Sequence, residues 1–201
     1  VRRHNESVLR ARYEDAAFFW DADLKVGLDD FRRNIDSLTF ENRLGSFAQR
    51  ADRIRDVAQA LAGHVELSGD DKTTLTRAGE LAKFDLSTQM VVELSSLAGT
   101  MAREYALKAG ETPAVAEALF EMEKPRSAGD SLPVSTPGAL LALADRFDLR
   151  RDIAFNTRVS GARFDEVIAP DGTLRPGPPV AENDQELIDF LVFLASRSEV
   201  N

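Results

Sequence analysis

The sequence predicts an all-α protein with a short appendage at its end. Across residues 5–148, apolar side chains recur at spacings of three and four, the period of a helix with one buried face. Gly, Pro and cap-forming Ser, Thr and Asp residues divide this pattern into segments of helical length. After residue 148 the pattern changes, so we expect a helical domain at 1–148 and a β-hairpin, a Pro-rich linker and a final helix at 149–201.

The composition is that of a globular protein without thiol chemistry. The chain has 201 residues, of which 43% are hydrophobic and 29% charged, and it has no Cys. The lack of Cys excludes disulfides and thiolate metal sites. No apolar run approaches the ~20 residues of a membrane helix, and the start shows no secretory signal pattern. We expect a cytoplasmic protein with no membrane contact, and the initial Val1 suggests a segment of a longer polypeptide.

The charge is unevenly distributed along the chain. The net charge is −9, which is not typical of a nucleic-acid-binding protein. Residues 1–55, however, hold 11 Lys and Arg against 10 Asp and Glu, whereas residues 56–201 hold 14 against 24. Any surface that contacts phosphate is therefore expected in the first quarter of the chain.

The first two predicted helices cover residues 5–24 and 28–38. Asn5 is a candidate N-cap of the first helix. One apolar stripe follows, made of Leu9, Tyr13, Ala16, Ala17, Trp20 and Leu24. Arg10 and Arg12 lie off this stripe, and we interpret Phe18, Phe19 and Trp20 as packing residues.

Four more helices are predicted between Phe40 and Asp148. Phe40 opens a helix that Gly63 ends. Ser68 or Asp70 can cap a helix that runs to Asp85. Thr112 and Pro113 begin a helix over 113–123, since a cap followed by Pro marks a helix start. The same signal at Thr136-Pro137 begins a helix that ends near Asp148.

The stretch Leu81–Ala106 reads as two helical pieces with a break at Gly99. Thr88 can cap the second piece, and an apolar stripe that includes Leu94 should face the core. Within this apolar frame lie Lys83, Asp85, Glu93 and Glu104. These charges mark either a site or a solvated flank.

The end of the chain changes character. Ile153, Phe155, Thr157 and Val159 alternate with other residues as on a half-buried strand, and Phe164–Ile168 suggests a second strand. Asp171-Gly172 is a turn signal. Pro residues at 176–179 indicate a stiff linker, and an amphipathic helix is predicted at about 184–196.

The chain also resembles a known family. Residues 81–106 are similar to the pattern L-x-K-x-D-L-x-T-x-M-V-x-E-x-x-x-L-x-G-x-M-x-x-x-Y-A of the helical domain in the β subunit of bacterial two-subunit glycyl-tRNA synthetases. Residues 5–23 resemble its N-E-x-V-L-R-A-R-L-x-D-A-x-F-F-W-x-x-D words, and the resemblance covers about residues 2–148. Departures are His4 for Gly, Ala98 for Gln, and Met122-Glu123 for a His-Tyr pair. The family-motif residues of interest are Lys83, Asp85, Glu93, Gly99, Tyr105, Asp145 and Asp148.

The resemblance implies a function. In that family the α subunit holds the ATP- and Mg²⁺-dependent adenylate site, and the β subunit binds tRNA. We therefore expect a segment of glycine–tRNA ligase with no catalytic residue and no cofactor of its own. Its expected partners are tRNA(Gly), the α subunit and the remaining β-subunit domains. The distribution of charge suggests Arg3, Arg10 and Arg12 as the tRNA-binding residues.

The helical domain of that β subunit is in turn similar to HD-type metal phosphohydrolases, so an HD-like fold is expected. Those enzymes use His residues, a His-Asp doublet and a distal Asp to hold a metal. This chain has only His4 and His64, and neither stands in the doublet region near Ala82-Lys83. Asp145 can occupy the distal Asp position, and we expect an ion pair between Lys83 and Asp145 instead of a metal. A self-sufficient phosphohydrolase and a non-catalytic helical scaffold remain the alternatives.

A second, local resemblance concerns residues 139–166. They are weakly similar to the words A-D-R-F-D-L-R-R-D-I-x-F-N-T-R-V of flavin-dependent Baeyer–Villiger monooxygenases. No Gly-x-Gly-x-x-Gly motif for a dinucleotide occurs in the chain.

Overall fold

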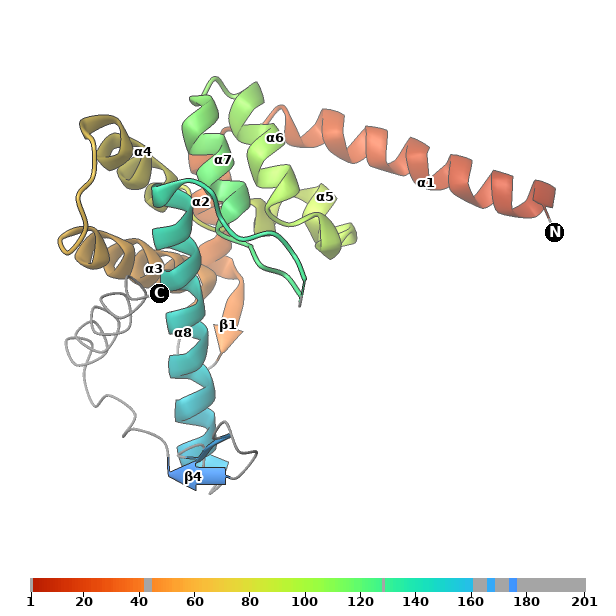
Figure 1. Cartoon of the computed structure of the whole chain (residues 1–201). Coiled ribbons are helices and arrows are strands. Elements are labelled where there is room, and N and C mark those ends of the chain that lie inside the picture. Colours follow the sequence, from red (N-terminus) through yellow and green to blue (C-terminus); the bar gives the residue numbers. More distant parts are fainter. Residues whose placement is uncertain (1, 42–44, 128, 161–165, 169–173, 177–201) are drawn as a thin grey trace.

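The computed structural model describes residues 2–41, 45–127, 129–160, 166–168 and 174–176. Over these residues the protein is mostly helical, as predicted (Figure 1). The helices α3 (Phe47–Ala62), α4 (Gly69–Glu80), α7 (Pro113–Glu121) and α8 (Thr136–Ser160) pack against one another around the hydrophobic core. None of the described helices combines the length and the apolar character that crossing a membrane requires.

The first helix, α1, extends away from this core (Figure 1). It spans Arg2–Asp23, so Asn5 lies inside the helix and is not its cap, contrary to our prediction. Only the C-terminal half of α1 packs on the domain, through side chains that include Phe19 and Trp20. Phe18 is 66% exposed, so our interpretation of it as a packing residue is wrong. Helix α2 (Leu28–Asn34) follows and tightens into the 3₁₀ turn η1 (Ile35–Ser37).

A small hairpin replaces the predicted start of the third helix. Strand β1 (Thr39–Glu41) pairs antiparallel with β2 (Gly45–Ser46), so the prediction that Phe40 opens a helix is wrong. The physical reason is a capping box: the Ser46 hydroxyl accepts from the N–H of Gln49, and the Gln49 side chain accepts from the N–H of Ser46. Helix α3 begins after this cap and ends at Gly63, as predicted.

The other helix starts follow cap chemistry. The Ser68 hydroxyl accepts from the N–H of Asp71 at the start of α4, and Thr112 caps α7 with Pro113 in its first turn, both as predicted. At α8 the cap lies one residue earlier than expected. The Ser135 hydroxyl, rather than that of Thr136, accepts from the N–H of Gly138 at 3.0 Å.

The stretch from Leu81 to Ala106 is more broken than two helices. Helix α4 ends at Glu80, so the prediction that it runs to Asp85 is wrong; the left-handed backbone of Lys83 cannot belong to a helix. After α4 come the 3₁₀ turn η2 (Phe84–Ser87), the short helix α5 (Gln89–Glu93), the 3₁₀ turn η3 (Ser95–Leu97) and helix α6 (Thr100–Lys108). Thr88 caps α5 and Gly99 separates the pieces, as predicted. Gly99 has φ +73°, a backbone conformation that residues with a side chain rarely adopt. Leu94 is partly buried against the core.

The last described part corrects the predicted first strand. Helix α8 continues to Ser160, so the alternation from Ile153 to Val159 does not form a strand. A short alternating run cannot stop an existing helix, because each added residue extends the helix at little cost. A hairpin is present further on, where β3 (Glu166–Ile168) pairs antiparallel with β4 (Leu174–Pro176). The predicted linker after Pro176 and the predicted final helix lie outside the described residues.

The domain boundary predicted at residue 148 falls inside α8, which passes through it without a break. That boundary stays a prediction.

Candidate functional site

The candidate site is built around Lys83, which stands where α4 gives way to η2. Its backbone has φ 62° and ψ 11°, the left-handed conformation, and it is the only described residue other than Gly with a positive φ. Such a conformation costs about 1 kcal/mol or more for a residue with a side chain, so other contacts must hold it. The side chain is buried within the domain.

Two carboxylates hold the Lys83 ammonium. Its Nζ lies 2.6 Å from Oε1 of Glu123, which follows α7, and 3.1 Å from Oδ2 of Asp145 in α8. Burial acts to lower the pKa of Lys83, but the charges of Asp145 and Glu123 outweigh it, and the pKa lies above its ordinary value. Lys83 is therefore a permanent cation, and the predicted ion pair with Asp145 is confirmed.

Two arginines of α3 extend this ion pair into a network. Arg50 NH2 donates to Oδ1 of Asp145 at 3.0 Å, and Arg50 Nε lies 3.5 Å from Oδ2 of Asp148. Arg53 donates to both Asp148 oxygens, with distances of 2.6 and 3.1 Å. Because Arg50 and Arg53, like Asp145 and Asp148, are three residues apart on a helix, both pairs lie on facing sides of α3 and α8.

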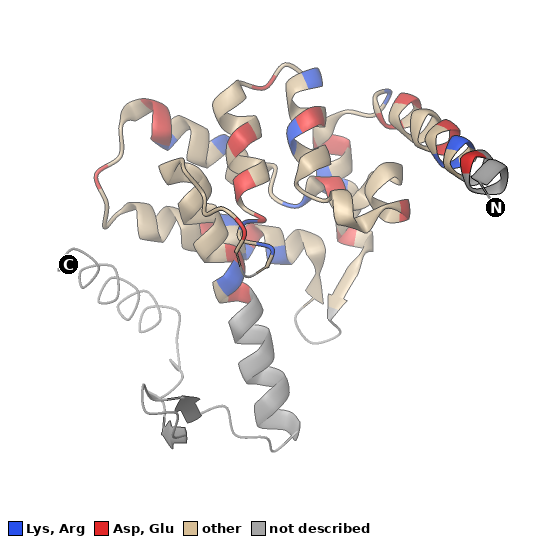
Figure 2. Ribbon diagram, turned by 45° about the vertical axis from the view of Figure 1, so that its right-hand side comes forward, with Lys and Arg blue, Asp and Glu red and all other residues tan. Residues whose placement is uncertain are grey.

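The charges of this network balance. Its cations are Lys83, Arg50 and Arg53, and its carboxylates are Glu123, Asp145 and Asp148. Figure 2 shows blue and red segments of α3 and α8 meeting in the middle of the domain. A balanced set avoids an uncompensated charge in the interior, which would be costly. We call these six residues the ionic cluster.

Asp85 is a buried carboxyl next to the ionic cluster. One of its oxygens accepts from the N–H of Gly99 at 2.7 Å. Burial raises the pKa of Asp85 to about 6, although the hydrogen bond from Gly99 acts to lower it; the Glu123 charge adds to the rise. A Cβ atom at Gly99 would lie 2.6 Å from Cγ of Glu123, so Gly is required there by space as well as by φ.

Tyr105 belongs to a separate buried group that joins α1 to the domain. Its hydroxyl donates to Oδ2 of Asp23 at 2.7 Å. The same Asp23 carboxylate accepts from the N–H groups of Gln89 and Met90, at 2.9 and 3.0 Å, at the start of α5. Trp20 stacks on the Tyr105 ring with centroids 5.0 Å apart. Burial, together with the Asp23 hydrogen bond, raises the pKa of Tyr105.

The remaining predicted residues lie apart from these groups. Glu93 is exposed on the surface at the end of α5. Arg10 and Arg12 are exposed on α1, and Arg3 occupies the first turn of α1, where its side chain lies outside the description. The family-motif residues thus divide: Lys83, Asp145 and Asp148 form part of the ionic cluster, Asp85 and Gly99 adjoin it, and Tyr105 anchors α1.

Sequence reasoning missed three members of the ionic cluster as site residues. Glu123 was noted only as a departure from the family's His-Tyr pair, and that departure was the usable signal. Arg50 and Arg53 have the spacing of three that could have matched Asp145 and Asp148.

The ionic cluster does not fit a metal ion. A metal site needs neutral or anionic donors with free lone pairs, whereas Lys83 and Arg50 present cations to the oxygens of Asp145. Within the described ranges, no group of three or more His, Cys, Asp and Glu side chains is arranged to hold a metal. The cluster can join helices through its ion pairs.

Comparisons with known proteins agree with the helical domain. Residues 1–155 match the family model described as "Glycyl-tRNA synthetase beta subunit". The chain is 45% identical over 148 residues to the "Glycine--tRNA ligase beta subunit" of Shouchella clausii, which covers 74% of this chain and 21% of the relative. The corresponding protein of Streptococcus agalactiae serotype Ia is 45% identical over 148 residues, 74% of this chain and 22% of the relative. That of Levilactobacillus brevis is 44% identical over 144 residues, 72% of this chain and 21% of the relative.

The chain therefore spans about a fifth of the length of the curated relatives that it matches. The local resemblance of residues 139–166 to monooxygenases gains no support from these comparisons.

Proposed function

Because the chain belongs to the glycyl-tRNA synthetase β subunit family, we propose that it is the segment of that subunit that supports tRNA binding during ATP-dependent glycyl-tRNA formation. The family match over residues 1–155 carries this proposal. The role places the protein in the cytoplasm, with tRNA(Gly), the synthetase α subunit and the remaining β-subunit domains as partners.

We assign the chemistry of glycine activation to the α subunit, with its ATP and Mg²⁺. Two features support this division. The ionic cluster neutralises its own charges, so it offers no free carboxylate or base to a substrate. The described strands are two or three residues long, too short for the antiparallel sheet that a class II synthetase site needs.

The exposed part of α1 is our candidate for contact with tRNA. Arg10 and Arg12 are exposed there. Residues two positions apart point about 200° apart on a helix, so Arg10 and Arg12 face different sides of α1. Positions 3 and 10 are about two helical turns apart, so they lie on the same side of α1. We propose that Arg3 and Arg10 face the same stretch of RNA backbone and that Arg12 makes a separate contact.

The test is tRNA(Gly) binding by the α/β holoenzyme at two salt concentrations. Each lost phosphate contact should reduce the log–log slope of affinity against salt by about 0.7–0.9. We expect this loss for Arg10→Ala and not for Arg33→Ala, which removes an exposed arginine of α2. If Arg10→Ala and Arg12→Ala leave both affinity and slope unchanged, the segment is a helical scaffold without RNA contact.

A self-sufficient phosphohydrolase is disfavoured because the Lys83 ammonium already pairs with the Asp145 carboxylate, which a metal would need as a ligand. Metal analysis of the purified protein separates the two functions. A stoichiometric transition metal that survives dialysis against chelator and is lost in Asp145→Ala would establish the phosphohydrolase alternative.

A further inference from the structure

The apolar stripe of α1 is covered by the domain over only half of its length. Ala16 and Trp20 face the core, where Trp20 stacks on Tyr105. The stripe continues towards the N-terminus through Tyr13 and Leu9, at spacings of three and four. There it is uncovered: Tyr13 is 74% exposed and Leu9 is 56% exposed.

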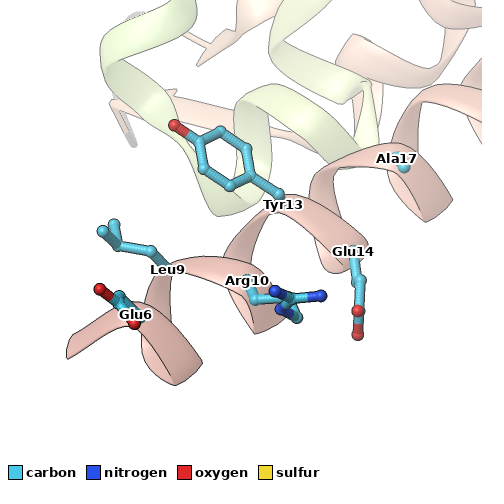
Figure 3. Close-up of a pocket in the computed structure, with 6 residues that line it drawn as sticks. All are labelled: Glu6, Leu9, Arg10, Tyr13, Glu14 and Ala17. Atoms are coloured by element: carbon cyan, nitrogen blue, oxygen red, sulfur yellow. The ribbon is translucent and has the colours of Figure 1, made fainter. Parts of the chain in front are cut away.

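The direction of α1 leaves its N-terminal half uncovered. Helix α1 extends away from the other helices, and none of the described elements lies over its N-terminal half (Figure 1). Leu9 and Tyr13 project from one side of the helix (Figure 3). Together with Glu6, Arg10, Glu14 and Ala17 they line a shallow, open depression, and all six residues belong to α1.

The residues of this depression suit an interface with another protein surface. A central Leu and Tyr bordered by charged side chains is the usual arrangement of an interface, with an apolar centre and a polar rim. Tyr adds a large apolar ring and a hydroxyl that can find a partner at the edge. The charged border is mixed, because it holds the carboxylates of Glu6 and Glu14 and the guanidinium of Arg10.

We propose that the Leu9–Tyr13 stripe is a docking surface for another part of the β-subunit polypeptide, which presents an apolar face to α1. This inference rests on the proposed function, in which the chain is a segment of the β subunit. The relatives indicate where such a face could come from. About four fifths of their length lies outside the part that this chain matches, and another domain of the subunit can therefore cover the stripe. The stripe thus continues the core of this domain into an interface between domains.

The two tyrosines of the chain provide a direct test. Tyr13 is 74% exposed and Tyr105 is 2% exposed, and the chain has no other Tyr. Nitration of the 201-residue chain, read by peptide mass spectrometry, should modify Tyr13 and spare Tyr105. In a full-length β subunit that carries this segment, Tyr13 nitration should fall at least tenfold. Equal nitration of Tyr13 in both proteins would overturn the proposal.

A matched pair of variants identifies the surface. Leu9→Glu places a charge on the stripe, and Ala11→Glu places the same charge on an exposed position about 200° around the helix. In the full-length subunit, Leu9→Glu should restore Tyr13 nitration, and Ala11→Glu should leave it protected. Both variants should leave the melting temperature of the 201-residue chain unchanged. Persistent protection in Leu9→Glu would contradict the proposal.

Other occupants give different results. If the 201-residue chain sediments as a dimer that Leu9→Glu abolishes, the stripe binds a second copy, and the proposal is wrong. It is also wrong if Tyr13 becomes protected only when tRNA is added. The proposed function can fail separately from the docking surface. An unchanged tRNA affinity in Arg10→Ala would not affect the nitration result. Exposed Tyr13 in an active holoenzyme would refute only the docking surface.

Discussion

The ammonium of Lys83 lies 3.1 Å from Oδ2 of Asp145, so the turn after α4 is tied to the middle of α8 by a buried ion pair. The same ammonium contacts Glu123, and Arg50 contacts the second oxygen of Asp145. The ionic cluster thus connects α3, α8, the turn after α4 and the end of α7.

Lys83→Met should destabilise the protein by about 3–5 kcal/mol, because it leaves Asp145 and Glu123 buried without their common partner. The measurement is urea unfolding followed by circular dichroism. Lys72→Met, at an exposed position of α4, is the matched control and should change the free energy of unfolding by less than about 0.5 kcal/mol. Equal effects of the two substitutions would contradict a structural role for Lys83.

Asp85 should make stability fall as the pH rises. Its pKa is raised to about 6 in the folded protein from an ordinary value of 3.8, so the folded state binds the proton more tightly than the unfolded state. The resulting stabilisation is fully present below pH 3.8 and is lost as the pH rises through about 6. It amounts to about 3 kcal/mol at most, from about 1.4 kcal/mol for each unit of pKa.

Asp85→Asn keeps an oxygen that can accept from Gly99 and removes this titration. We expect Asp85→Asn to become more stable relative to the parent chain as the pH increases from 4 to 7. The check is the melting temperature across that range, with exposed Asp70→Asn as the control. A constant difference between parent and Asp85→Asn would show that Asp85 does not titrate there.

Gly99→Ala should cost more than Gly110→Ala. Both glycines have positive φ, +73° and +90°, so a side chain at either position strains the backbone. A Cβ at Gly99 would also collide with Glu123, whereas no atom lies within 4 Å of one at Gly110. Thermal unfolding of both variants tests for this additional collision. Equal decreases in melting temperature would contradict the close approach of Glu123 to Gly99.

Asp23→Ala should loosen α1 from the domain. It removes the acceptor for the Tyr105 hydroxyl and for two N–H groups of α5, at a cost of about 2–4 kcal/mol. Trp20 is the only Trp and stacks on Tyr105, so its fluorescence reports the separation. Asp21→Ala, exposed on the same helix, should leave the emission spectrum unchanged, and an unchanged spectrum in Asp23→Ala would refute the anchor.

Ending the chain at Arg151 should leave the helical domain folded. The ionic cluster lies at or before Asp148, and the described core residues precede it. Because α8 continues to Ser160, the cut removes helical turns, and a modest decrease in melting temperature is expected. An unfolded or insoluble product would show that the predicted boundary at 148 is wrong.

Local signals predicted most of the fold, and their limits explain the errors. The stripes of α3 and α7 and the caps Ser68, Thr88 and Thr112 were readable, because helix period and capping depend on neighbours within four residues. The hairpin at Phe40 was missed because its residues also fit the stripe of α3. The capping box of Ser46 and Gln49, which decides against that reading, was present in the sequence.

The site was only partly predictable. The Lys83–Asp145 pair followed from the resemblance to a family, which placed both positions at one centre. The pairs of Arg50 and Arg53 with α8 join residues 95 positions apart, and the matching spacing of three on each helix does not by itself show that α3 and α8 meet. The strand expected at Ile153 failed because periodicity over a few residues cannot outweigh a helix that continues from α8.

That separation of 95 residues also has a consequence for biosynthesis. Arg50 and Arg53 leave the ribosome long before Asp145 and Asp148, so they stay in water while the intervening elements are made. A contact of such long range forms only after a large loop has closed, which slows folding relative to local helix formation. The final ordering of the core therefore awaits the synthesis of α8, and a ribosome that stalls before it would display α3, α4 and α7 without the helix that completes their core.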